Sequence, residues 1–224
     1  MSHPIVQTIS LVAAAATGIA QAQSLAGAGN LVLNGSLVSG GVATLDSGGA
    51  ARRVIIASVA DDSTLVWTIT GTIRDPGNPS SSTAAVETLA GAGAGLSVQS
   101  LNDFLTVTRI AGSKATAGNV TAGTNGWGSA PAVPWDRYGP PFEISVAAYV
   151  LAGAPTYQLE VTYDDVYGTW LATGQSVKWI AWPDMTGKSA DAQTKIDADI
   201  CATRLTLTAV GSVQVTQRQQ DGHG

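Results

Sequence analysis

The chain has 224 residues, of which only 12% are charged, and its formal net charge is −5. Its 11 lysines and arginines are scattered, so the sequence lacks the clustered cations that neutralise phosphates, and no nucleic-acid partner is expected. A single cysteine excludes an internal disulfide framework and a cysteine zinc site. The two histidines, His3 and His223, lie near the ends of the chain, where neither is well placed to activate a nucleophile.

Residues 1–26 are predicted to form an extended or partly helical N-terminal arm. Residues 20–22 resemble a signal-peptidase site, but no lysine or arginine precedes the apolar run 9–20, so a cleaved secretory signal is not favoured. The run is also too short and too polar to span a bilayer, and no membrane partner is expected. We expect the arm to pack on a neighbouring subunit through its apolar side chains, Ile5, Ile9, Leu11, Ile19 and Leu25.

Residues 27–125 are predicted to form a first antiparallel β-sandwich domain, because short Val/Thr/Leu runs alternate with Gly, Asn, Asp and Ser turns. The clearest strand is 64–73, in which Leu65, Trp67 and Ile69 fall on one side. The other strands are expected at 31–33, 42–45, 53–58, 83–89, 105–110 and 120–122, with a short turn at 101–104.

Two segments between strands are candidates for protein contact. The loop 75–82 carries Asp75, Pro76 and Asn78 at its tip. The stretch 123–141 is rich in glycine and proline and is predicted to be a linker between domains; its aromatic residues include Trp127, Trp135 and Tyr138. These aromatics either anchor the crossing between the domains or form an exposed docking loop.

A second β-sandwich domain is predicted over residues 126–224. Strands are expected at 142–151, 157–163, 177–182, 205–208 and 213–216, and a helix at 190–201. The sequence therefore predicts an all-β protein with two antiparallel β-sandwich domains preceded by the arm; the alternative is one larger, irregular sandwich.

Residues suited to chemistry are few, and no cofactor, metal or catalytic residue is expected. Glu143 and Glu160, on strands that could lie side by side and pair, are candidates for a glycosidase pair, but solvated strand faces are the favoured interpretation. The aspartate pairs at 61–62 and 164–165, and the aspartates in 197–199, are candidates for calcium, but turn formation is the favoured interpretation. Three tryptophans offer a sugar-stacking platform or core packing, namely Trp170, Trp179 and Trp182.

Several segments together carry a resemblance to a known group of proteins. They are GAGNLVLNG at 27–35, GVATL at 41–45, RRVII at 52–56, DDS at 61–63, TITGT at 68–72, GTNGWGS at 123–129 and PWD at 134–136. With these segments the chain resembles virion structural proteins of tailed bacteriophages that decorate the head or are associated with the virion. The resemblance covers roughly residues 27–165 and implies β domains, no catalysis and many copies on a particle.

The leading hypothesis is a non-enzymatic capsid cement or decoration protein that bridges neighbouring capsid subunits. A surface with little charge suits this role, because little charge must be desolvated on association. Its partners would be the major capsid protein or other virion proteins, with self-association, and its location the virion, assembled in the bacterial cytoplasm. The alternatives are a tail or head-to-tail component that anchors fibres, a carbohydrate-binding module and, last, a hydrolase.

Overall fold

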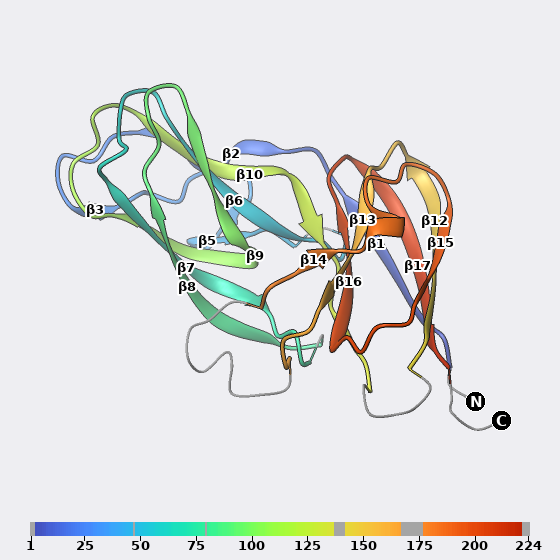
Figure 1. Cartoon of the computed structure of the whole chain (residues 1–224). Helices are drawn as coiled ribbons and strands as arrows, with labels where there is room; N and C mark the ends of the chain where they lie inside the picture. The colour runs from blue at the N-terminus through green and yellow to red at the C-terminus, as the bar shows by residue number, and fades with distance from the viewer. Residues whose placement is uncertain (1–2, 47, 79, 137–141, 167–176, 221–224) are drawn as a thin grey trace.

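The computed structural model describes residues 3–46, 48–78, 80–136, 142–166 and 177–220. Within these residues the chain consists of antiparallel strands and one 3-10 turn, η2 (Pro183–Met185), which confirms the predicted all-β class. No helix of the described part is long and apolar enough to cross a membrane. Figure 1 shows two lobes side by side, the first mainly blue to green and the second mainly yellow to red.

The strands divide between the two lobes. The first lobe contains β2 (Ala15–Gln23), β3 (Gly29–Asn30), β4 (Val38–Ser39), β5 (Val42–Thr44), β6 (Ala51–Ser58), β7 (Val66–Arg74), β8 (Ser82–Ala90), β9 (Ser97–Gly112) and most of β10 (Val120–Ser129). The second lobe contains β1 (Ile5–Leu11), β11 (Val133–Pro134), β12 (Ile144–Gly153), β13 (Tyr157–Thr162), β14 (Ile180–Ala181), β15 (Ala192–Ile196), β16 (Ala202–Leu207) and β17 (Gly211–Gln219).

Two sheets organise these strands. The smaller sheet has four strands in the order β1-β17-β12-β15 and lies wholly in the second lobe. The larger sheet has 13 strands, and its main path β14-β13-β16-β10-β6-β9-β5-β4 runs through both lobes. Strand β10 makes this connection, because Gly128 and Ser129 pair with β16 on one side and with β6 on the other. The two lobes therefore share one hydrogen-bonded sheet.

Each lobe encloses its own hydrophobic core. The core of the first lobe is centred on Trp67, Ile69 and Phe104. The core of the second lobe lies between the four-stranded sheet and strands β13 and β16, and it includes Tyr157. The Tyr157 hydroxyl donates to the carbonyl oxygen of Ala190 at 2.7 Å, and burial raises the pKa of this phenol above its ordinary value of 10.0.

The N-terminal segment differs from the expected arm. It is extended, but β1 pairs with β17 over seven residue pairs and β2 pairs with β10, so both strands belong to the sheets of this chain. Ile9 and Leu11 are buried in the second core and Ile19 in the first. An arm that packs on a neighbour through these three side chains is therefore wrong, because burial in its own cores satisfies them. Ile5 and Val6 at the start of the segment, and Val12 between β1 and β2, keep their apolar side chains exposed.

Two further predicted elements are corrected by the structure. The glycine-rich start of the predicted linker is strand β10, and a Cβ atom on Gly123 would lie 1.9 Å from the Ala15 carbonyl oxygen. Glycine is needed there because β2 crosses closely, and not because the chain is a linker. The predicted helix at 190–201 contains strand β15, whose backbone groups pair with β12. That pairing overrides the local helix propensity.

Strands β7 and β9 build the part of the first lobe that carries the site. In β7 the predicted alternation is confirmed, since Trp67 and Ile69 are buried and Thr68 and Thr70 are only partly covered. Strand β9 pairs with β6 through residues 97–104 and with β7 through residues 104–112. The register with β6 shifts between Asp103 and Gln99, so residues 100–102 bulge out of the ladder where a turn was predicted.

Candidate functional site

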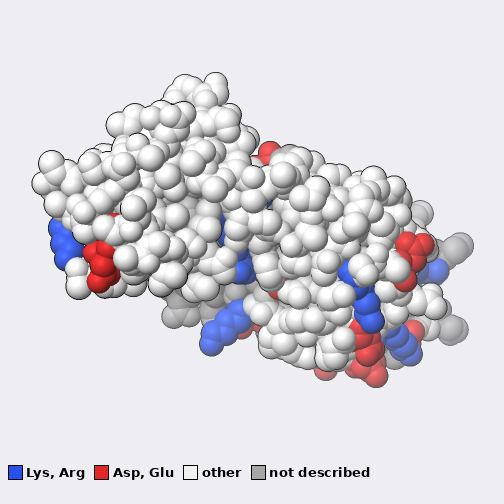
Figure 2. Space-filling model, turned by 90° about the horizontal axis from the view of Figure 1, so that it is seen from above, with Lys and Arg blue, Asp and Glu red and all other residues white. Residues whose placement is uncertain are grey.

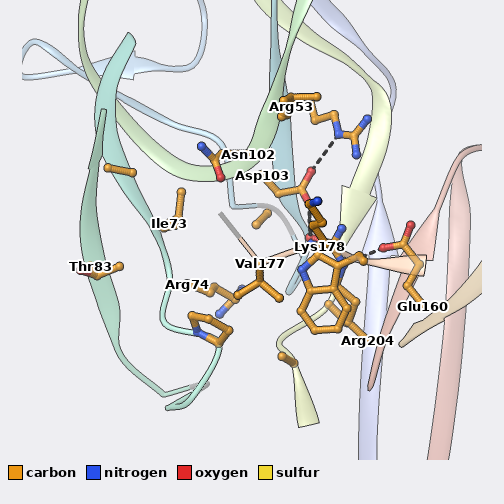
Figure 3. Close-up of a pocket in the computed structure, with 18 of the residues that line it drawn as sticks. Arg53, Ile73, Arg74, Thr83, Asn102, Asp103, Glu160, Val177, Lys178 and Arg204 are labelled. Atoms are coloured by element: carbon orange, nitrogen blue, oxygen red, sulfur yellow. Dashed lines mark hydrogen bonds and ion pairs between the residues drawn. The ribbon is translucent and has the colours of Figure 1, made fainter. Parts of the chain in front are cut away.

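A cleft of about 360 Å³ lies where the two lobes meet. Its first wall consists of residues from β6, β7, β8 and the bulge of β9; its second wall consists of Glu160 on β13, Arg204 on β16 and residues 177–179 before β14. Figure 3 shows this arrangement, with Thr83 and Ile73 on one side and Glu160 and Arg204 on the other. The cleft is where charged side chains from both lobes come together.

Four of these side chains form a continuous ion-pair network across the junction. Arg53 Nε lies 3.3 Å from Asp103 Oδ1, and Arg204 Nη1 lies 2.9 Å from Asp103 Oδ2. Arg204 Nε then lies 2.6 Å from Glu160 Oε2. Arg53 and Asp103 belong to the first lobe and Glu160 and Arg204 to the second, so the Asp103–Arg204 pair crosses the junction.

The two carboxylates of the network are buried and fully engaged. The side chains of Asp103 and Glu160 are 5% and 7% exposed. Ser129 Oγ also donates to Asp103, while Gln158 Nε2 and Thr206 Oγ1 donate to Glu160. Because buried charges are tolerated only when they are paired and hydrogen-bonded, this arrangement fixes the junction in one geometry.

Each arginine of the network also stacks on a tryptophan. The Arg53 guanidinium lies 4.3 Å from the centre of the Trp127 ring, and the Arg204 guanidinium lies 4.5 Å from that of Trp179. Cation–π contacts of this kind hold the planar groups in place while their N–H groups donate to the carboxylates. Each arginine of the network is therefore held by a tryptophan, and of the two tryptophans Trp179 also lines the cleft.

Arg52, next to Arg53 on β6, points to the opposite face and serves a different part of the molecule. It is buried, and among the described residues it makes no ion pair. Its Nη2 donates to the carbonyl oxygens of Ala13 and Asn125, and burial lowers its pKa below the ordinary value of 12.5. Arg52 thus ties the connection between β1 and β2 to strand β10.

Glu87 on β8 accepts hydrogen bonds from the bulge of β9, whose residues Leu101 and Asn102 line the cleft. Its Oε1 accepts the Leu101 backbone N–H at 2.6 Å, and its Oε2 accepts the backbone and side-chain N–H groups of Asn102 at 3.0 and 2.9 Å. The bulge leaves these backbone donors outside the ladder, so the carboxylate supplies the acceptors that a neighbouring strand would provide.

We expect the substitution Glu87→Ala to lower the free energy of unfolding by about 1–3 kcal/mol, because it leaves two backbone donors without an acceptor. Urea denaturation measures this change. Thr88→Ala, at the exposed next position of β8, is the matched control and should change stability by less than about 0.5 kcal/mol. Equal stability of the two variants would show that Glu87 does not hold the bulge.

The cleft is cationic although the chain is acidic. Four cations line it, Arg53, Arg74, Lys178 and Arg204, against the two carboxylates of the network. Arg74 pairs with Asp46 at 3.1 Å. Lys178 is exposed, and its amino group makes no ion pair with any described residue.

The predicted contact residues are distributed over the molecule, and the structure does not gather them into one surface. Trp127 is half-buried under Arg53, and Trp135 is buried in the second core with its Nε1 donating to Thr203. Leu25 packs against the first core. The loop after β7 forms as predicted: Asp75 accepts the Gly77 and Asn78 N–H groups, Asn78 is exposed and Pro76 lines the cleft. Tyr138 lies outside the described residues.

The residues considered for chemistry are also separated. Glu143 lies beside the four-stranded sheet and pairs with Lys195, whereas Glu160 is in the larger sheet, so the two strands expected to pair do not. Trp182 packs on the second core and bonds Thr194, Trp179 lines the cleft, and Trp170 lies outside the described residues.

The aspartates considered as calcium ligands accept backbone hydrogen bonds where the structure shows contacts. Asp61 accepts the Ser63 N–H group, and this hydrogen bond lowers the pKa of Asp61. Asp62 accepts the Ala117 N–H group, and Asp164 accepts the Lys178 N–H group. In the part of the chain that the structure describes, no three His, Cys, Asp or Glu side chains are placed to hold a metal ion.

Comparison with known proteins adds one structural likeness. No protein-family model matches the chain, and no curated protein matches it in sequence. Among solved structures, the crystal structure of the PBSX exported protein XepA matches over 96% of this chain and 86% of its own, with 11% sequence identity and a TM-score of 0.27. A likeness this low supports no inference about function.

The sequence did not single out the network as a site, although it carried a usable signal. Charged residues make up only 12% of the chain, yet Arg53, Asp103 and Arg204 all fall inside strands with buried neighbours. A charge at a half-buried strand position requires a partner, so in a chain this poor in charge such positions should pair with one another.

Proposed function

We propose that this chain is a non-enzymatic structural protein of a bacteriophage particle, and specifically a capsid cement or decoration protein that bridges neighbouring capsid subunits. The observation that carries the proposal is the distribution of charge. The junction holds the buried ion-pair network, and broad outer faces are left almost without charge. Figure 2 shows one such face, white over most of both lobes, with charged side chains near the ends and at the junction.

The outer face of the four-stranded sheet illustrates a surface suited to assembly. Its exposed and half-exposed side chains are mostly uncharged, with Lys195 and Arg218 toward one end; the uncharged ones include Thr8, Ala147, Tyr149, Gln193, Gln214 and Thr216. Cross-strand pairing places Thr216 beside Ala147 and Gln214 beside Tyr149, so these side chains lie together on one face of the sheet. Association through such a face requires little desolvation of charge.

We further propose that the two cores are the two β-sandwich domains expected from the sequence. A body with two domains locked by ion pairs and by a shared sheet can touch two subunits at once and hold them at a fixed spacing. Many weak contacts of this kind, repeated over a shell, add up through avidity. Stiffness at the junction supports this role, because a flexible hinge would let the bridged subunits separate.

The number of copies on purified particles tests the proposal. For a cement protein we expect on the order of hundreds of copies, because an icosahedral shell repeats its seams many times. Quantitative mass spectrometry of gradient-purified particles measures the ratio to the major capsid protein. About six, twelve or eighteen copies would instead place the chain in the tail or at the head-to-tail junction. Absence from the particles would contradict a virion role altogether.

A further inference from the structure

We propose that the free edge of strand β8, where it borders the cleft, receives an extended acidic segment of a neighbouring protein as an added strand. Addition of a strand to an exposed sheet edge is a common mode of peptide recognition, in which backbone hydrogen bonds supply affinity and side-chain pockets supply selectivity. Three features of the described residues carry this inference: the open edge, its position in the cleft and the cations that line the cleft.

Strand β8 presents a long edge that no described strand covers. Its nine residues pair with β7, and no other described strand pairs with it. Natural sheets guard such edges with lysine, proline, a bulge or a charge turned inward. Lysine, proline and a bulge are absent from β8, and Glu87, which is turned inward to the β9 bulge, lies beyond the stretch 83–86 that borders the cleft. Among the described residues, no strand pairs with the outer N–H and C=O groups of this edge, which can therefore accept another strand.

The edge itself, and not only one face of the strand, borders the cleft. Four consecutive residues of β8, numbers 83–86, line it. Side chains alternate between the two faces of a strand, so four successive residues can meet one cavity only along the strand's edge. At about 3.3 Å per residue this stretch is roughly 10 Å long, enough for three or four residues of an added strand.

The cations of the cleft select the character of the segment. On the wall opposite β8, the Lys178 amino group makes no ion pair with any described residue. On the same wall as β8, Arg53 donates only its Nε–H to Asp103, which leaves its remaining N–H groups without a described protein acceptor. Asp103 and Glu160 are already engaged by arginines. Glutamate or aspartate side chains of a bound segment would therefore accept hydrogen bonds from the free donors, whereas lysine or arginine side chains would be repelled by the cations.

The rim offers apolar contacts for the residues between the acidic ones. Val86 on β8 is 65% exposed, and Ile73, Pro76 and Val177 also line the cleft. Alternating side chains of an extended segment face opposite sides, so one set can contact these apolar groups while the other meets the cations. The segment that fits best alternates acidic with β-branched residues.

Binding of a synthetic peptide tests the cleft directly. The probe is a fluorescein-labelled peptide of nine residues, the length of β8, that alternates valine with glutamate; its control carries glutamine in place of glutamate. By fluorescence anisotropy with the full chain we expect binding that weakens with salt and is about tenfold weaker for the glutamine peptide. Hydrogen exchange of the backbone amides at 83–86 should slow when the glutamate peptide binds.

Two pairs of variants separate the charge of the cleft from its edge. Lys178→Ala should weaken binding about fivefold or more, whereas Lys195→Ala removes the same charge on the four-stranded sheet and should leave binding unchanged. Ala84→Asp places a charge on the exposed edge of β8 and should abolish binding, whereas Thr8→Asp, at an exposed position of β1, should not. Circular dichroism confirms that each variant is folded.

Other outcomes would overturn the proposal. If neither peptide binds and the chain forms a dimer that Ala84→Asp dissociates, the occupant of the edge is a second copy. If both peptides bind equally, the cleft does not select acidic residues. The inference rests on the proposed function only in one respect, that the segment comes from a neighbouring protein of the particle. If the peptide binds but the chain is absent from particles, the proposed function is contradicted and the cleft is still a binding site for acidic segments.

Discussion

Replacing Asp103 with alanine is expected to lower the free energy of unfolding by about 3–5 kcal/mol, because it leaves Arg53 without a carboxylate and Arg204 with Glu160 alone at the junction. Arg53 and Arg204 are only 16% and 12% exposed there, so water cannot replace the lost partner fully. The loss should also weaken the connection between the lobes, since the Asp103–Arg204 pair joins them. Urea denaturation followed by tryptophan fluorescence and by circular dichroism measures both effects.

Asp46→Ala is the matched control for this substitution. Asp46 pairs with Arg74 at a comparable distance, but its side chain is 38% exposed, so its removal should cost about 0–1 kcal/mol. If Asp103→Ala and Asp46→Ala unfold at the same urea concentration, the network does not stabilise the junction. If the two probes report separate transitions only in Asp103→Ala, the ion pairs are what makes the lobes unfold together.

Replacing Ile9 with alanine is expected to destabilise the protein by about 2–5 kcal/mol, because the side chain is 0% exposed in the second core and its loss leaves a cavity. Ile5→Ala, on the same strand and the same face but 40% exposed, should cost less than about 1 kcal/mol. Thermal or urea unfolding of the two variants gives the comparison directly.

The same reasoning predicts that a chain lacking residues 1–11 does not form the second core. It would lose Ile9 and Leu11 from that core and the pairing partner of β17. A truncated chain with the native circular dichroism spectrum and stability would show instead that this segment is a dispensable arm, as its sequence had suggested.

The all-β class could be predicted because it depends on local alternation. Strand β7 shows this best, since Leu65, Trp67 and Ile69 fall on one side in the sequence and are buried in the structure. Positions that depend on distant partners could not be predicted. Strand β1 pairs with a strand some two hundred positions away, as the Ser10–Ser212 hydroxyl contact illustrates, and no local pattern identifies that partner.

The cleft could not be predicted for the same reason. Arg204 lies 101 positions from Asp103 and 44 from Glu160 in the sequence, and these residues come together only in the folded chain, where both lobes share one sheet. The sequence indicates Glu160 only as half of a glycosidase pair with Glu143, because strands that follow one another in the chain are expected to pair. The actual neighbour of β13 is β16, which comes much later in the chain.

Strand β10 has a consequence for how the molecule responds to force. Because its last residues hydrogen-bond to β6 and β16 at once, bending one lobe against the other would require breaking backbone hydrogen bonds and not merely sliding surfaces. A force applied to one lobe is therefore transmitted through β10 to the other lobe. We expect the junction to deform little under force and the two lobes to unfold together in one abrupt step.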